Sequence, residues 1–244
     1  MTFDLSFKNK NQMQILFFKT VLFIHVICGA LALIAGGIAM ATKKGNSTHK
    51  KAGIVFYWAM FYIFISTIVF IIMYPDNLKY QFFLGIGIIS FYPNWSGKRM
   101  LNMKKVFEPQ LIDKVGAVLI GISGLIMLGY GAYLSKYPNP NFGGLNILFF
   151  IFGLVSISNC YGDVRVYFGF RKIEKMHWFF AHGGKMIGAY SAAMTAFCVN
   201  IVPRYIPANA PDYVQIMTWV VPGVTIGILG NRILKRYKVK LRQA

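Results

Sequence analysis

Long apolar segments separated by short polar connections dominate this sequence and restrict what it can fold into. The hydrocarbon core of a bilayer is about 30 Å thick, so about 20 apolar residues in a helix cross it. Segments of this kind lie at residues 16–41, 52–74, 80–102, 112–135, 145–168, 177–201 and 213–232. We therefore predict an all-α membrane protein, a bundle of seven transmembrane helices in contact with the lipid bilayer.

Composition agrees with this prediction and argues against other classes. The 244 residues are 56% hydrophobic and 14% charged, whereas a soluble domain carries about 25% charged residues. The net charge of +19 comes from short clusters between apolar segments rather than from one basic face, so we expect no nucleic-acid partner. Cys28, Cys160 and Cys198 lie inside apolar segments without CxxC spacing, and we interpret them as small buried residues.

The positions of the cations predict the orientation of the chain, because cytoplasmic loops are enriched in Lys and Arg. Four clusters fall on alternate connections and at the C-terminus. They are Lys43, Lys44, Lys50 and Lys51; Lys98, Arg99, Lys104, Lys105 and Lys114; Arg165, Arg171, Lys172 and Lys175; and Arg232, Lys235, Arg236, Lys238, Lys240 and Arg242. We expect these clusters and the C-terminus in the cytoplasm and, with seven spans, the N-terminus outside.

The sequence predicts a single transmembrane domain over residues 1–244, with a polar N-terminal tail at 1–14 and a basic cytoplasmic tail at 233–244. The first span continues through ALALIAGGIAMA without the cleavage pattern of a signal peptide, so we expect it to be retained.

Ionisable residues inside the spans are the candidate functional positions, because such groups usually face the bundle interior and have partners. The sixth span carries His182 and, three residues on, Lys185. Lys185 lies close enough to the cytoplasmic interface for its long side chain to reach headgroups. We expect His182 to face inward, with Asp163 at the same depth as its hydrogen-bond partner. The alternative is an ion pair of Asp163 with Arg99 or Arg165.

Small residues recur beside three histidines and predict faces where helices approach closely. These are Gly29, Ala32 and Gly36 after His25, Gly53 after His49, and Gly184, Gly188 and Ala192 after His182. We expect the faces in spans one and six to be buried against other helices. Ser47 or Thr48 is expected to cap the second helix.

The segments HVICGALALIAGGIAM, KKGNSTHKKAGIVFYWAM, SGKRM, FGLVSISNCYGDVR and AHGGKMIGAYSAAMTAF together resemble a family of uncharacterised bacterial multi-pass inner-membrane proteins. The resemblance covers all seven spans and implies a bacterial cytoplasmic (inner) membrane location. The polar positions that recur in the family correspond to His25, His49, Arg99, Asp163 and His182. Lys185 occupies a position where the family favours arginine.

Two hypotheses fit these residues. In the first, two of His25, His49 and His182 bind a b-type haem or a divalent metal ion in a redox or metal-handling protein, because histidine is a usual axial ligand and nearby glycines offer a porphyrin a flat surface. Asp163, Arg99 and Lys185 are the supporting polar residues. In the second, the chain is a non-catalytic membrane subunit with protein partners or a small proton-linked transporter with a hydrogen-bonded polar core. No catalytic signature decides whether the chain is an enzyme.

Overall fold

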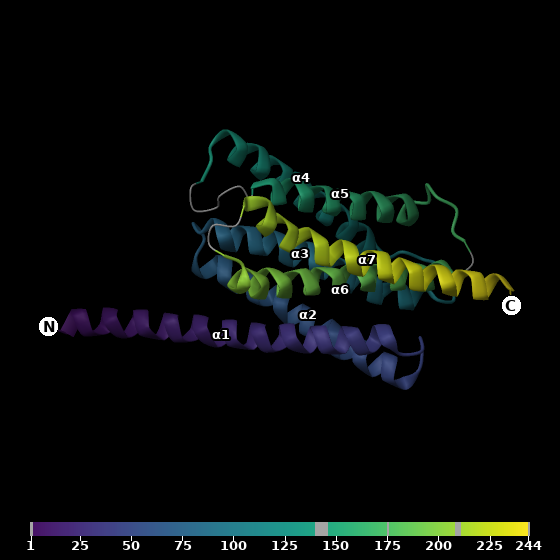
Figure 1. Cartoon of the computed structure of the whole chain (residues 1–244), viewed down its shortest axis with the longest axis horizontal. Coiled ribbons are helices and arrows are strands. Elements are labelled where there is room, and N and C mark those ends of the chain that lie inside the picture. The colour runs from purple at the N-terminus through teal and green to yellow at the C-terminus, as the bar shows by residue number, and fades with distance from the viewer. Residues whose placement is uncertain (1, 140–145, 175, 208–210, 244) are drawn as a thin grey trace. The chain divides into compact units, whose positions relative to one another are not determined.

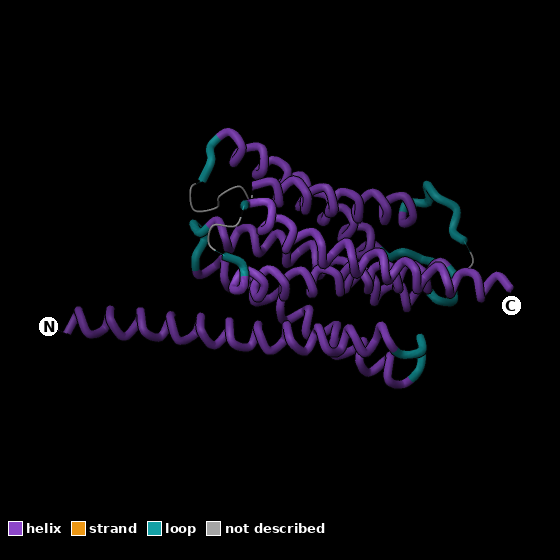
Figure 2. Tube along the Cα trace, viewed as in Figure 1, coloured by secondary structure: helices purple, strands orange, loops and turns teal. Residues whose placement is uncertain are grey.

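The computed structural model describes residues 2–139, 146–174, 176–207 and 211–243, and these residues form helices and loops with no strand (Figures 1 and 2). The α-helices are α1 (Thr2–Ala41), α2 (Ser47–Met73), α3 (Leu78–Arg99), α4 (Leu111–Lys136), α5 (Ile147–Tyr167), α6 (His177–Ile201) and α7 (Asp212–Gln243). Short 3₁₀ turns, η1 (Met100–Met103) and η3 (Val202–Tyr205), follow α3 and α6. The prediction of an all-helical chain is confirmed. Residue 145 of the fifth predicted span, Lys175 and Ala244 lie outside the described residues.

Six of the described helices are long and apolar enough to cross a bilayer, which identifies a multi-pass membrane protein. The apolar stretches are Gln12–Ala41, Ser47–Met73, Leu111–Lys136, Ile147–Tyr167, His177–Tyr205 and Tyr213–Val239. The third predicted span, helix α3, is not among the six. Its polar residues, which include Asn94 and Arg99, reduce its hydropathy. α3 and α7 remain helical through Pro93 and Pro222.

The chain divides into two compact units, residues 1–84 and 85–244, and the division falls inside α3. In the first unit, α1 and α2 form a hairpin. Its tight turn uses Gly45 at a φ of +84°, a conformation that costs glycine little. The prediction that Ser47 or Thr48 caps α2 is wrong, because the side chain of Asn46 accepts the backbone N–H of His49 at 2.7 Å.

Aromatic side chains join the three helical segments of the first unit. The Phe18 ring lies 5.3 Å from Phe70, 5.2 Å from Tyr74 and 5.9 Å from Tyr80, measured between ring centroids. Tilted and edge-on arrangements at these distances are the favoured geometries of aromatic pairs. They connect α1 and α2 to the first turn of α3.

In the second unit, α4 packs beside α5 and α6 beside α7 (Figure 1). Two glycines allow α4 and α5 to approach. A Cβ atom on Gly124 would lie 2.9 Å from the Gly153 carbonyl oxygen, and one on Gly153 would lie 3.0 Å from the Gly124 carbonyl oxygen. Backbone contact of this kind is characteristic of small-residue helix packing in membranes.

The small-residue faces predicted beside the histidines are only partly confirmed. On α1, Ala32 and Gly36 are buried and Gly29 is half-buried. On α6, however, Gly184 and Gly188 are exposed, so the prediction for this helix is wrong. The face that packs on α7 lies one residue earlier, where a Cβ on Gly183 would meet Leu234 at 2.7 Å and one on Gly230 would meet Ile187 at 2.5 Å. One residue rotates a helix face by about 100°.

Candidate functional site

Helix α3 provides one side of the candidate site and is the most enclosed segment of the second unit. No residue from 85 to 99 is exposed, and the side chains of Asn94 and Ser96 are fully buried. Gly97 brings α3 against α6, where its Cβ position would lie 2.9 Å from Cβ of Lys185. Polar groups on this helix are therefore shielded from lipid and need partners inside the unit.

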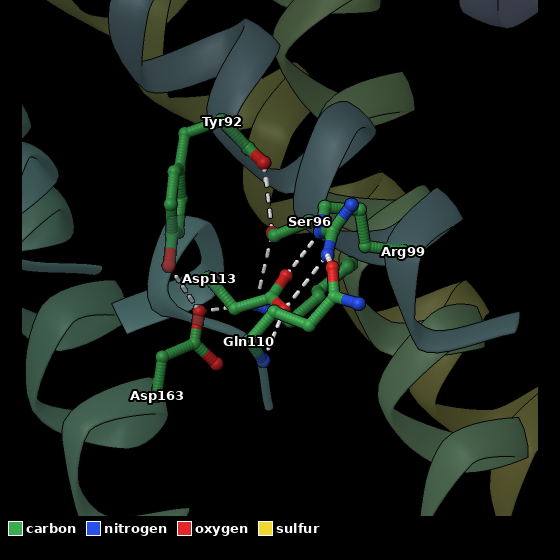
Figure 3. A network of polar contacts seen from close by, with 7 residues as sticks. Tyr92, Ser96, Arg99, Gln110, Asp113 and Asp163 are labelled. Carbon is green, nitrogen blue, oxygen red and sulfur yellow. Dashed lines mark hydrogen bonds and ion pairs between the residues drawn. The ribbon is translucent and has the colours of Figure 1, made fainter. Parts of the chain in front are cut away.

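An ion pair between Asp163 of α5 and Lys185 of α6 lies against the buried face of α3. Each of the two side chains is only 11% exposed. The Tyr92 hydroxyl donates to Oδ2 of Asp163 at 2.5 Å, and Nζ of Lys185 donates to Oγ of Ser96 at 3.0 Å. Figure 3 shows the Tyr92 ring extending toward the Asp163 carboxylate. Three helices thus contribute to one desolvated acid–base pair.

The groups that surround Nζ of Lys185 are ones that interact favourably with an ammonium. Its Nζ lies 5.2 Å from the centroid of the Tyr92 ring, within the range of a cation–π interaction. The Ser96 hydroxyl donates its own proton to the Tyr92 carbonyl oxygen at 2.8 Å, so its lone pairs are directed to the ammonium. Burying a charge is costly unless it is paired and hydrogen-bonded, and Lys185 is both.

A second ion pair lies one helical turn further along α3, between Arg99 and Asp113 at the start of α4 (Figure 3). The contact is bidentate: Nε of Arg99 donates to Oδ1, and Nη2 donates to Oδ2 at 2.9 Å. Nη2 also donates to Oε1 of Gln110 at 2.8 Å, and the Gln110 backbone N–H donates to Oδ2 of Asp113 at 2.9 Å. The fully buried Asp113 therefore joins the C-terminal end of α3 to the N-terminal cap of α4.

Three histidines singled out in the sequence share one hydrogen-bonding arrangement. In each, Nδ1 contacts an oxygen: the Gly97 carbonyl for His182 at 2.8 Å, the Ser66 hydroxyl for His25 at 2.5 Å, and the Ala39 carbonyl for His49 at 2.9 Å. A carbonyl oxygen only accepts, and the Ser66 hydroxyl already donates to Ile63 at 2.6 Å, so Nδ1 carries the proton. In the neutral ring the lone pair then lies on Nε2.

Several expected partners differ from the observed ones. Lys185 does not extend to the headgroups but pairs with Asp163. The alternative pairings of Asp163 are also wrong, because Arg99 binds Asp113 and Arg165 donates to the Tyr161 hydroxyl at 3.1 Å. The tautomer of His182 is fixed by the Gly97 carbonyl rather than by the Asp163 carboxylate expected for this role.

Tyr92 is one of the residues of the site that the sequence analysis did not single out. A signal for it exists, because Tyr92, Ser96 and Arg99 stand four and three residues apart and therefore share one face of a helix. A polar face at this spacing inside an apolar segment indicates an interior-facing helix. Asp163 and Lys185 were singled out because they are ionisable residues inside apolar segments.

Among the described residues, no group of three or more His, Cys, Asp or Glu side chains is placed to hold a metal ion. His25 and His49 belong to the first unit and His182 to the second. Binding of haem or a metal ion by these histidines therefore stays a prediction.

Comparisons of the chain with known protein families, curated proteins and solved structures find no match. The resemblance to a bacterial membrane-protein family stays a prediction. The candidate site consists of two ion pairs, Asp163–Lys185 and Arg99–Asp113, both in contact with or contributed by α3.

Proposed function

We propose that the protein spans a bacterial inner membrane seven times, with α3 as the third span. At 1.5 Å per residue, the 22 residues of α3 extend over about 33 Å, which matches the hydrocarbon thickness. Burial of α3 at residues 85–99 allows its polar side chains to lie at membrane depth. The basic connections support a cytoplasmic C-terminus and an external N-terminus.

Within this bundle, we propose that the Asp163–Lys185 pair is the proton-linked site of a small transporter or membrane subunit. The observation that carries the proposal is the burial of a carboxylate and an ammonium in one network contributed by three helices. Ionisable pairs inside a membrane bundle commonly mark proton or substrate pathways.

The chemistry links protonation to helix packing. A proton on the Asp163 carboxyl removes the charge that holds Lys185, and the contact between α5 and α6 then loses its electrostatic attraction. The hydroxyls of Tyr92 and Ser96 donate and accept hydrogen bonds beside the pair. A change in protonation therefore favours a different arrangement of these helices, as coupling in a transporter requires.

Proton flux into proteoliposomes tests this proposal. Vesicles that contain the full-length protein and a pH-sensitive dye receive a potassium diffusion potential through valinomycin. We expect flux above that of empty vesicles, strong reduction in Asp163→Asn, and partial reduction in Tyr92→Phe, which keeps both charges. The control Glu174→Gln changes an acid that is paired at the surface and should retain the flux. Equal flux in wild type and Asp163→Asn would contradict the proposal.

A second candidate function is binding of a b-type haem or a metal ion through His25, His49 or His182. The observation in its favour is the hydrogen bond that each ring makes through Nδ1, because a hydrogen bond at one ring nitrogen orients the other for ligation. Absorption spectra of the purified protein, oxidised and dithionite-reduced, combined with elemental analysis, distinguish the two candidates. A colourless, metal-free protein excludes the second.

A further inference from the structure

A surface groove of about 380 Å³ lies between α1 and α2 in the first unit. Its apolar lining includes Leu31, Ile34 and Ile38 of α1 and Val55 of α2. All four of these side chains are exposed, with Ile34 the most exposed at 62%. The groove therefore presents exposed apolar surface on a hairpin whose two helices are each long and apolar enough to cross a bilayer.

One end of the groove is polar. Ser47, Thr48 and Lys51, all in the first turns of α2, line it beside the turn that joins the two helices. Because α1 and α2 form a hairpin, Ile38 lies toward this polar end and Leu31 toward the opposite end. The stretch from Leu31 to Ile38 covers about 10 Å along the helix. The lining thus changes from hydroxyl and ammonium groups at one end to apolar groups at the other. The apolar part is long enough to contact part of an acyl chain.

Lys51 supplies the charge at the polar end. Its side chain is exposed, and none of the ion pairs among the described residues includes it. The neighbouring Lys44 is differently placed, because its Nζ donates to the carbonyl oxygens of Ala39 and Met40 at 2.9 and 2.8 Å and closes the end of α1. Lys51 is therefore the cation positioned to meet a ligand in the groove.

We propose that this groove binds an anionic phospholipid. Its phosphate would contact Lys51 and the hydroxyls of Ser47 and Thr48, and an acyl chain would lie along Leu31 and Ile34. The turn between α1 and α2 follows an apolar span and so reaches the headgroup region of whichever leaflet it meets, which makes the inference independent of the orientation of the chain. The apolar lining distinguishes a lipid from free phosphate as the occupant.

Native mass spectrometry of the full-length protein in mild detergent tests the site. The protein is titrated with dioleoyl phosphatidylglycerol, with dioleoyl phosphatidylcholine and with inorganic phosphate. We expect one phosphatidylglycerol to bind more tightly than phosphatidylcholine, and inorganic phosphate not to displace it. Lys51→Gln should weaken phosphatidylglycerol binding about fivefold, the effect of one cation near the headgroups. The matched control Lys50→Gln removes the adjacent exposed cation, which does not line the groove, and should bind as wild type does.

Three results would overturn the proposal. Equal weakening by Lys51→Gln and Lys50→Gln would indicate diffuse attraction to a basic surface. Equal binding of the two lipids would show that no anionic group is recognised. The absence of a tightly bound lipid in the wild type would indicate that another part of the chain, or a second copy of it, covers the groove. Both lysines are exposed, so neither variant is expected to disturb folding.

Discussion

At the scale of single residues, the role of Lys185 depends more on the groups that surround its side chain than on its being a lysine. A lysine eight residues from the start of an apolar segment is able to reach the interface. Here a carboxylate, a hydroxyl and an aromatic ring surround Nζ within the bundle instead. Removal of a buried partner is costly because the remaining charge cannot be rehydrated. Removing one member of the pair should therefore cost more stability than removing both, and measurements of the free energy of unfolding can detect this difference.

Lys185→Met should lower the free energy of unfolding by about 3 to 5 kcal/mol, because the Asp163 carboxylate is left buried without its cation. Unfolding by sodium dodecyl sulfate in mixed micelles measures the loss. The double variant Asp163→Asn with Lys185→Met should recover part of it. The control Lys238→Met breaks an exposed pair with Glu174, whose side chains are 44% and 65% exposed, and should cost less than about 1 kcal/mol. Similar losses in both single variants would show that the Asp163–Lys185 pair is not desolvated.

Asn46 provides a second prediction at this scale. Asn46→Ala removes the side-chain oxygen that accepts the His49 N–H at the start of α2 and should destabilise the protein by about 1 kcal/mol. The matched change Ser47→Ala affects the next residue, which does not cap the helix, and should have little effect. The same unfolding titration compares them. A larger effect of Ser47→Ala would contradict the observed cap.

At the scale of helices, the sequence predicted the spans better than the helix ends. Hydropathy marks the part of a helix that lies in hydrocarbon, but α1 begins at Thr2 and α7 continues to Gln243. The polar end of α7 at residues 235–243 consists largely of Lys, Arg, Leu and Gln, which favour helix, so helical structure extends beyond the apolar segment there. Length and hydropathy were sufficient to locate the helices, but hydropathy alone did not show where they end.

Contacts between helices were harder to predict, because hydropathy does not fix the rotation of a transmembrane helix about its own axis. The step from Gly184 to Gly183 changes the face by about 100°, and with it the neighbour of α6. His182 and Lys185 stand three residues apart and lie on one side of α6, yet His182 contacts the Gly97 carbonyl and Lys185 contacts Asp163. Depth predicted that Asp163 and His182 lie at one level, but it did not predict which side chain of α6 pairs with Asp163.

The contact between α4 and α5 yields a prediction at the helix scale. Gly124→Leu should destabilise the protein by about 1 to 3 kcal/mol, because overpacking forces the backbones apart where a Cβ would lie 2.9 Å from the Gly153 carbonyl. Gly129→Leu is the matched control on the same helix, since nothing lies within 4 Å of its Cβ position. The free energy of unfolding in micelles should fall for the first variant and stay near the wild-type value for the second. Equal free energies of unfolding for the two variants would show that α4 and α5 do not meet closely at Gly124.

At the scale of the whole molecule, α3 determines both the topology and the chemistry. It presents Tyr92 and Ser96 to the Asp163–Lys185 pair and Arg99 to Asp113. An isolated segment of this polarity would enter a bilayer less readily than the six apolar helices. Its burial among other helices compensates for that cost. The number of spans therefore depends on whether α3 crosses the membrane.

Cysteine accessibility in the full-length chain decides between six and seven spans. Cys28, Cys160 and Cys198 are first replaced by alanine, and a single cysteine is then introduced as Asp76→Cys before α3 or as Glu108→Cys after it. If α3 crosses the membrane, a membrane-impermeant maleimide added to intact cells should label the first variant and not the second, because we expect the basic connection after α3 in the cytoplasm. A fluorescent protein fused after Ala244 should fluoresce in the cytoplasm and provides the reference.

Labelling of both cysteines, or of neither, would place residues 76 and 108 on one side of the membrane and would show that α3 is not a span. The Asp163–Lys185 pair would then lie against a helix that does not cross the bilayer, and the proposed proton pathway would lose its basis.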